Sequence, residues 1–258
     1  MIQIPEISVS PYEGQAHVQG EMPTHSALFR GDTQLPAVLA TRLSAEAESP
    51  LRIASIGASF GAEADSALVY ALEMAPRIGR ITLTGFDINE RTVSQAQRGK
   101  YLATVASRRT EHGRVPIDLA PLVPMLDVTP TGEASYGQYV VDTNRMRQQH
   151  NVTFAQRDIL AEPPTMSPQD IILCNNMLFH LTAEKAEAML QAMATMLAPG
   201  GVLSIGANPK QLRMSGNRDS TDYIGWRHAM AEKLAVQGIG AVLYDKARKA
   251  PFVFRRDA

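Results

Sequence analysis

The chain has 258 residues, 45% of them hydrophobic, which fits one large α/β domain with a substantial core and at most a small appendage. Its 25 basic and 26 acidic residues give a formal net charge of −1, so no overall field draws it to nucleic acid or to an anionic membrane. The single cysteine, Cys174, excludes an internal disulfide. Its position at the end of the apolar run DIILC predicts a buried side chain in a reducing compartment rather than a catalytic thiol.

The first 23 residues are expected to form an irregular arm, because prolines and glycines stand at positions 5, 11, 14, 20 and 23. They have neither a basic start nor a long apolar core, so no signal peptide or membrane span is predicted there and cytoplasm is the expected location. A helical pattern follows over 35–47, with Leu35, Val38, Leu39 and Leu43 on one side.

Residues 51–87 predict a βαβ unit that binds an adenosine cofactor. The apolar strand LRIASIG (51–57) runs into the glycine turn GASFG (57–61), a helix over about 62–75 and a second strand, ITLTGFD, that ends at Asp87. Glycines let the backbone approach a ligand, and a carboxylate at the strand end can accept both ribose hydroxyl protons. The dinucleotide pattern G-x-G-x-x-G is missing, since Ala58 and Ser59 follow Gly57, so S-adenosylmethionine fits better than a cofactor with a pyrophosphate.

The same turn also matches the G-x-S-x-G nucleophile elbow of α/β-hydrolases, with Ser59 as the nucleophile. Asp170 and His228 would complete the triad in the order that this fold uses. Only 58 residues precede Ser59, however, and the first 25 or so show little strand pattern, whereas the hydrolase fold needs several strands there. We therefore favour a plain turn serine.

The rest of the chain continues the alternation of strands and helices. Asn89 is expected to cap a helix over 90–98 that Gly99 ends, and Thr182 to cap a long helix closed by 198–201, whose methionines pack in the core. A further helix is expected over about 221–236. The remaining strands are NVTFAQRDIL (151–160), DIILC (170–174), GVLSIGA (201–207), GAVLY (240–244) and PFVFR (251–255). This predicts a mostly parallel sheet with ligands at the carboxyl ends of its strands.

Residues 100–150 interrupt this alternation. Prolines at 116, 121, 124 and 130 and the strand-like YGQYVVD predict a subdomain or lid inserted into the main fold. Such insertions often select the acceptor of an enzyme.

Five segments also carry a family resemblance. SALFRGD (26–32) is similar to a T-x-F-F-R start, GASFGAEADS (57–66) to a G-x-S-x-G-E-E-x-Y-S turn, and FDINERTVSQAQRGKY (86–101) to an acidic strand end with its helix. RDIL (157–160) is similar to a strand ending in a polar–leucine pair, and CNNMLFHL (174–181) to C-R-N-V-M-I-Y-F. From about Thr24 to Phe254 the chain thus resembles the chemoreceptor glutamate methyltransferase (CheR) family, a branch of the class I S-adenosylmethionine methyltransferases. The resemblance implies a Rossmann-like α/β fold with a mostly parallel seven-stranded sheet, helices on both faces and residues 24–258 as the methyltransferase domain.

The resemblance also implies a set of cofactor-binding residues. The serine and arginine of the first segment would approach the methionine or sulfonium end, the glycine turn and its glutamate would line the methionine, and Asp87 would hold the ribose. Asp158 and Ile159 would border the adenine, although Asp158 could instead cap a loop and Arg30 form a surface ion pair. The full set is Ser26, Arg30, Gly57, Ser59, Glu63, Asp87, Ile88, Asp158, Ile159, Asn175 and Asn176.

Three departures from the family pattern stand out. Ala62 replaces the first glutamate after the turn, and His180 replaces the tyrosine near the transferred methyl group. About 23 residues precede the match, so we expect the helical domain that precedes the catalytic domain in chemoreceptor methyltransferases to be absent. These differences weaken the expectation of a receptor helix as the substrate.

Methyl transfer from a sulfonium is an in-line displacement that needs alignment more than acid chemistry. A carboxylate acceptor needs no general base, whereas an amine, phenol or hydroxyl does, and His180 has an intrinsic pKa suited to that role unless it merely packs. Arg30 would orient an anionic acceptor. The expected catalytic residues are therefore His180 and Arg30, and the expected acceptor is a protein or small-molecule carboxylate or another small molecule. No metal, nucleic-acid or membrane partner is predicted. A cofactor-binding module with little catalysis and a serine hydrolase using Ser59 are the alternatives.

Overall fold

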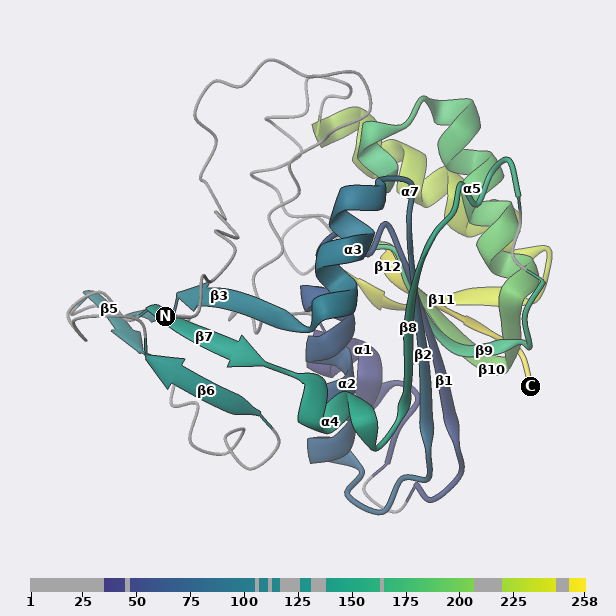
Figure 1. Cartoon of the computed structure of the whole chain (residues 1–258). Coiled ribbons are helices and arrows are strands. Elements are labelled where there is room, and N and C mark those ends of the chain that lie inside the picture. Colours follow the sequence, from purple (N-terminus) through teal and green to yellow (C-terminus); the bar gives the residue numbers. More distant parts are fainter. Residues whose placement is uncertain are drawn as a thin grey trace.

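A seven-stranded sheet forms the centre of the computed structural model (Figure 1), which describes residues 35–44, 47–104, 107–110, 113–116, 126–130, 138–162, 165–206, 220–244 and 251–258. The strand order is β11-β12-β10-β9-β1-β2-β8. All paired neighbours in this sheet are parallel except at β12, which runs antiparallel to both β10 and β11. The strands are β1 Leu51–Ile56, β2 Ile81–Asp87, β8 Asn151–Gln156, β9 Gln169–Leu173, β10 Leu197–Ser204, β11 Ile239–Tyr244 and β12 Pro251–Arg256. The predicted mostly parallel, seven-stranded sheet is confirmed.

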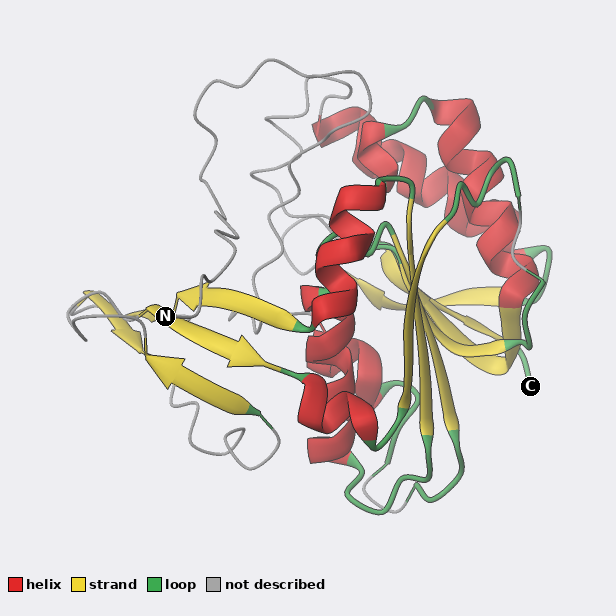
Figure 2. Cartoon of the chain, in the orientation of Figure 1, coloured by secondary structure: helices red, strands yellow, loops and turns green. Residues whose placement is uncertain are grey.

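Helices cover both faces of this sheet (Figure 2). On one face lie α1 (Leu35–Ala40), α2 (Ala62–Met74) and α3 (Glu90–Arg98), and on the other α5 (Ala183–Met196) and α7 (Ser220–Ala235). Alternate residues of β1 serve the two apolar clusters, since Ile53 packs with α1 to α3 and Ile56 with α5 and α7. Helices on both faces of the sheet bury β1 at all positions but Arg52 and bury β9 throughout.

The predicted helix ends near residue 90 are confirmed in detail. The side-chain oxygen of Asn89 accepts hydrogen bonds from the backbone N–H groups of Arg91 and Thr92 at the start of α3. Gly99 ends the helix in the left-handed conformation, with a φ of 63°. Thr182 likewise caps α5, where its hydroxyl accepts the N–H of Lys185. The methionines of α5 pack in the core, as expected, at positions 189, 193 and 196.

Two predicted boundaries are wrong. The helix expected over 35–47 ends at Ala40, and Arg42, just beyond it, pairs with Asp170 of β9 at 2.9 Å. The sequence pattern suggested a longer helix because Leu43, which lies beyond the helix end, is buried as well. The turn expected at 198–201 lies inside β10, where the ladder shifts register between Leu197 and Val202.

The described parts of residues 100–142 form sheets of their own beside the main fold. In the described parts of this segment, β3 (Lys100–Thr104), β7 (Gln138–Asp142) and β6 (Asp127–Pro130) make an antiparallel sheet in the order β3-β7-β6. A hairpin joins β4 (Ser107–Thr110) to β5 (Gly113–Pro116). The three-stranded sheet projects from the side of α3 and of the short helix α4 (Asn144–Gln148), away from the central sheet (Figure 1). We call residues 100–142 the insert; they are the part of the predicted 100–150 subdomain that precedes α4, and the role of that subdomain as a lid or acceptor-selecting segment stays a prediction.

The arm predicted over 1–23 lies outside the described residues. Within the described ranges, no helix is long and apolar enough to cross a membrane.

Candidate functional site

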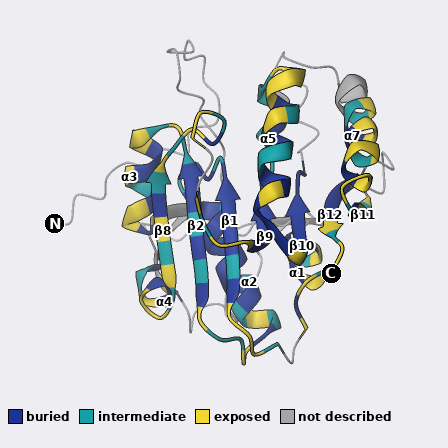
Figure 3. Ribbon diagram, turned by 90° about the vertical axis from the view of Figure 1, so that its right-hand side faces the viewer, coloured by how far each residue is buried: buried dark blue, intermediate teal, exposed yellow. Residues whose placement is uncertain are grey.

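The carboxyl ends of β1, β2, β8 and β9 meet at one edge of the sheet, because these strands are parallel. The arrowheads of β1 and β2 mark this edge in Figure 3. The strand order reverses between β1 and β9, since β2 and β8 continue on one side of β1 and β9 and β10 on the other. Open α/β sheets bind ligands outside the strand ends at such a switch point. Every described residue of the expected cofactor set ends or follows one of these strands or lies in the first turn of α2.

The glycine turn after β1 is held tightly against the end of β2. The Ala58 N–H donates to the carbonyl of Phe86, and the Ser59 N–H donates to Asp87 Oδ2 at 2.7 Å. Gly57 has a φ of 68°, and a Cβ atom there would lie 2.8 Å from Cγ of Met177, in the loop after β9. Only glycine fits this backbone and this contact. The two loops on either side of the switch point therefore pack directly on each other.

Asp87 is half-buried at the end of β2 and orders the loops on both sides of it. Its Oδ2 accepts from Ser59 and its Oδ1 accepts the N–H of Asn89 at 3.0 Å. A carboxylate has about four acceptor positions, so these two bonds leave capacity for a ribose diol. The next residue, Ile88, exposes 61% of its surface, an apolar side chain beside the carboxylate that suits the flat face of a base.

Asp158, two residues after the end of β8, caps a turn. Its Oδ1 accepts the N–H groups of Leu160 at 2.9 Å and Ala161 at 3.4 Å, which is the loop-cap alternative raised by the sequence. Contact with an adenine amino group stays a prediction. Ile159 is 3% exposed and packs in the apolar cluster under the loops, together with Phe86.

Asn175, directly after β9 and Cys174, connects three segments through its amide group. Its Nδ2 donates to Glu63 Oε1 at 2.8 Å, and its Oδ1 accepts from the Ser204 hydroxyl and from the Gly206 N–H, both at 2.7 Å. The next residue, Asn176, adopts a φ of 58° and donates its N–H to the Gly206 carbonyl at 2.7 Å. The loops after β9 and β10 and the first turn of α2 are thereby fixed relative to one another.

Two nearby titratable side chains are held in their neutral forms. His180 ends the short helix η2 (Leu178–His180), and burial lowers its pKa to about 4. Sequence reasoning expected a pKa near neutrality, so this side chain is a much weaker base than expected. Burial, and secondarily the charge of Glu63, raise the pKa of the Cys174 thiol, which agrees with the predicted inert cysteine.

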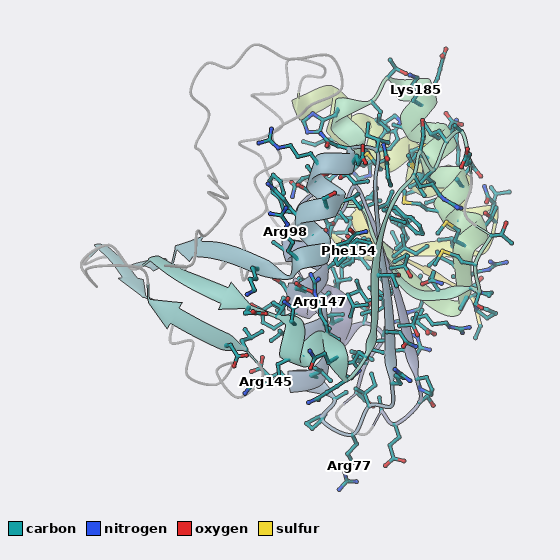
Figure 4. All side chains as sticks on the ribbon, in the orientation of Figure 1. Arg77, Arg98, Arg145, Arg147, Phe154 and Lys185 are labelled. Atoms are coloured by element: carbon teal, nitrogen blue, oxygen red, sulfur yellow. The ribbon has the colours of Figure 1, made fainter. Side chains whose placement is uncertain are left out.

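A buried ion pair next to this site was missed by the sequence analysis. Asp65, fully buried in the first turn of α2, accepts two hydrogen bonds from Arg147 of α4, at 2.9 and 2.6 Å, and one from the Thr143 hydroxyl at 2.8 Å. Arg147 also donates to the Ala96 carbonyl at the end of α3, and its guanidinium carbon lies 4.9 Å from the centroid of the Phe154 ring. The Arg147 and Phe154 side chains are labelled in Figure 4. The available signal was a carboxylate on the apolar stripe of α2, because a buried charge requires a partner.

A family model described as CheR methyltransferase, SAM binding domain, matches residues 25–113 and 131–227, more than half of the chain. The chain belongs to the CheR methyltransferase family. Its cofactor is S-adenosylmethionine, and its fold is that of the Rossmann-like class I methyltransferases, both as predicted. The gap in the match, 114–130, falls within the insert.

Curated CheR relatives are similar over the same region. A chemotaxis protein methyltransferase of Vibrio parahaemolyticus is 28% identical over 194 residues, and chemotaxis protein methyltransferase 1 of Vibrio cholerae is 26% identical over 196 residues. Each match covers 72% of this chain and 65% of the relative, so the chain spans about two thirds of their length. Among solved structures, the N-methyltransferase NodS of Bradyrhizobium japonicum with bound S-adenosyl-L-homocysteine is 18% identical, with a TM-score of 0.48, 87% of this chain covered and 86% of that one.

The serine hydrolase alternative is wrong for this CheR-family chain. Asp170 lies in the first half of β9, where it binds Arg42 and the Arg52 N–H, at the end of the sheet opposite Ser59. His228 is exposed on α7. The three residues of the supposed triad therefore do not converge.

Two members of the expected set, Ser26 and Arg30, lie outside the described residues, although both fall within the family match. Among the described residues, no group of three or more His, Cys, Asp or Glu side chains is placed to hold a metal ion.

Proposed function

We propose that this CheR-family chain transfers the methyl group of S-adenosylmethionine to a carboxylate, either a glutamate of a protein or a small acid. The observation that carries the proposal is the match to the CheR methyltransferase model, and the burial of His180, which lowers its pKa to about 4, agrees with it. An amine or hydroxyl acceptor must lose a proton during methyl transfer and needs a base matched to neutral pH. A carboxylate is already ionised at pH 7, so a weakly basic imidazole suits it.

The chemistry then requires alignment. When bound, S-adenosylmethionine supplies a methyl group on a positively charged sulfur; the carboxylate oxygen forms a bond to this methyl carbon as the carbon–sulfur bond breaks, leaving a methyl ester and neutral S-adenosylhomocysteine. Asp87 is proposed to hold the ribose, Ile88 to cover the adenine and Glu63 to bind the methionine amino group. Arg30 is proposed to orient the acceptor carboxylate by a bidentate contact. A neutral His180 lines the acceptor mouth and leaves the acceptor ionised.

The Vibrio relatives support a protein acceptor, because both are named as chemotaxis protein methyltransferases. A small acid fits the same chemistry. A cytoplasmic location and the absence of nucleic-acid and membrane partners remain predictions.

Cofactor binding is tested by calorimetric titration with S-adenosylhomocysteine. We expect Asp87→Ala to weaken binding by about 1.5–3 kcal/mol, since it removes charged hydrogen bonds to the ribose. Asp87→Asn removes the charge and keeps an acceptor for only one of the two loop N–H groups, so we expect it to bind no more tightly than the wild type. Asp127→Ala, which removes an exposed carboxylate in the insert, is the control and should bind like the wild type. Equal affinity of the wild type and Asp87→Ala would show that Asp87 does not hold the ribose.

The acceptor class is tested with tritiated methyl groups. Protein and small-molecule candidates are incubated with methyl-labelled S-adenosylmethionine, and the products are treated with alkali, which releases methanol from esters and leaves methylated amines and ethers intact. We expect alkali-labile label, and a rate that changes little in His180→Gln. Alkali-stable label that depends on His180 would instead indicate an amine or hydroxyl acceptor. Tight cofactor binding without label on any candidate would favour the alternative of a cofactor-binding module with little catalysis. That alternative is suggested by Ala62, which stands where the family has a glutamate.

A further inference from the structure

Ser204 is an unusual residue for its position. It is the last residue of β10, fully buried, between Leu203 and Ile205, which are also fully buried. Its backbone pairs with Leu173 of β9 and Val253 of β12, so it lies in the interior of the sheet. A buried hydroxyl costs free energy unless it forms a hydrogen bond, and an apolar residue would continue the strand equally well. The hydroxyl donates a hydrogen bond to Asn175 Oδ1 at 2.7 Å.

Ser204 is the second donor to an amide oxygen whose orientation the Gly206 N–H sets, so it anchors the Asn175 side chain on β10. The backbone N–H of Gly206 can only donate, and it lies 2.7 Å from the same oxygen, so Oδ1 must point toward β10. The NH₂ group then points toward α2, where it donates to Glu63 Oε1 at 2.8 Å. If the amide were flipped, its NH₂ group would face the Gly206 N–H and its oxygen would face the Glu63 carboxylate, and both contacts would be repulsive.

Glu63 is half-buried in the first turn of α2, two residues after Gly61, which begins that helix with a φ of 81°. A long glutamate side chain has several rotamers, and a hydrogen bond from a fixed partner selects one of them. The carboxylate is therefore held in place from β10, through Asn175, across the mouth of the sheet.

We infer that Ser204 is a positioning residue for the amino-acid end of the cofactor, acting through Asn175 on the Glu63 carboxylate. This inference rests on the proposed assignment of Glu63 to the methionine amino group. It deepens that assignment, because it adds a buried residue that touches no ligand and yet sets affinity for one end of the ligand only.

The test compares two ligands by calorimetry. S-adenosylhomocysteine carries the amino-acid end, and 5′-methylthioadenosine lacks it while keeping the adenosine. We expect Ser204→Ala to weaken binding of S-adenosylhomocysteine roughly fivefold to tenfold, the effect of one buried hydrogen bond, and to leave 5′-methylthioadenosine within about twofold. Ser204→Thr keeps the hydroxyl and should restore most of the loss.

The matched control is Ser55→Ala. Ser55 is also a fully buried strand serine, in β1, but its hydroxyl has no hydrogen-bond partner among the described residues. This variant should bind both ligands like the wild type. A double-mutant cycle with Glu63→Gln adds a second readout: if Ser204 acts through Glu63, Ser204→Ala should have little further effect in that background.

Four outcomes would overturn the inference. Unchanged affinity of Ser204→Ala for S-adenosylhomocysteine, or an equal loss for both ligands, would do so while leaving the proposed function intact. Losses that add fully in the double-mutant cycle would also separate Ser204 from Glu63. A wild-type protein that binds neither ligand would instead overturn the proposed function, and this inference with it.

Discussion

The buried pair of Asp65 and Arg147 allows a quantitative prediction about stability. The Arg147 side chain is 8% exposed and Asp65 is fully buried, so truncating the arginine in Arg147→Met leaves a charged carboxylate in the core without its cation, while the hydrogen bond from the Thr143 hydroxyl is retained. Removing one partner of a buried ion pair typically costs about 3–5 kcal/mol. Arg147→Met also removes the hydrogen bond to Ala96 and the contact with the Phe154 ring. We therefore expect a loss of at least about 3 kcal/mol in the free energy of unfolding.

Urea unfolding measures this loss, and a thermal melt should show a fall in Tm of roughly 6–20 °C for a protein of this size. The matched control is Arg145→Met on the same helix. Arg145 is 47% exposed and lies 3.4 Å from Asp127, itself 58% exposed, so the control should change stability by no more than about 0.5 kcal/mol.

The double variant Asp65→Asn/Arg147→Met separates the charge from the packing. If the uncompensated carboxylate causes the loss, making it neutral should recover roughly 1–3 kcal/mol relative to Arg147→Met alone. A single variant within about 1 kcal/mol of the wild type, or a double variant no more stable than the single one, would refute the reasoning.

Two further predictions concern the turn and the pH. Gly57→Ala should weaken S-adenosylhomocysteine binding at least tenfold and destabilise the fold by about 1–3 kcal/mol, because Gly57 has a positive φ and a Cβ there would contact Met177. Gly240→Ala, with open space around it, is the control. Equal behaviour of the two variants would contradict this account. The pKa of His180 is lowered in the folded state, so its contribution to stability is present above about pH 6.5 and is lost as the pH falls toward about 4. Urea midpoints measured across this window should decline less steeply in His180→Gln than in the wild type or in the exposed control His228→Gln, and three parallel profiles would contradict the assignment.

Local features of this fold could be predicted from the sequence because their causes are local. Asn89 and Gly99 bound α3 where expected, since a side-chain cap and a left-handed glycine depend on a few neighbouring residues. The buried strands and the glycine turn were equally visible, because apolar runs and glycines act through backbone geometry. The end of α1 was predicted wrongly; just beyond it, Arg42 pairs with Asp170, 128 positions away in the chain.

The candidate site divides in the same way. The sequence placed Asp87 at the end of β2 by counting along one βαβ unit. It could not show that Arg147 meets Asp65 from 82 residues away or that Ser204 meets Asn175, because these contacts depend on which strands become neighbours. The neutral state of His180 was also out of reach, since burial sets its pKa and the sequence does not give burial.

The two ends of the insert are joined to each other. The Thr143 N–H donates to the Gly99 carbonyl at 2.8 Å, so the chain leaves and re-enters the main fold at almost one point. A segment attached in this way can change in length or sequence without altering the register of the central sheet. The residues of the cofactor site can therefore stay the same while the insert changes.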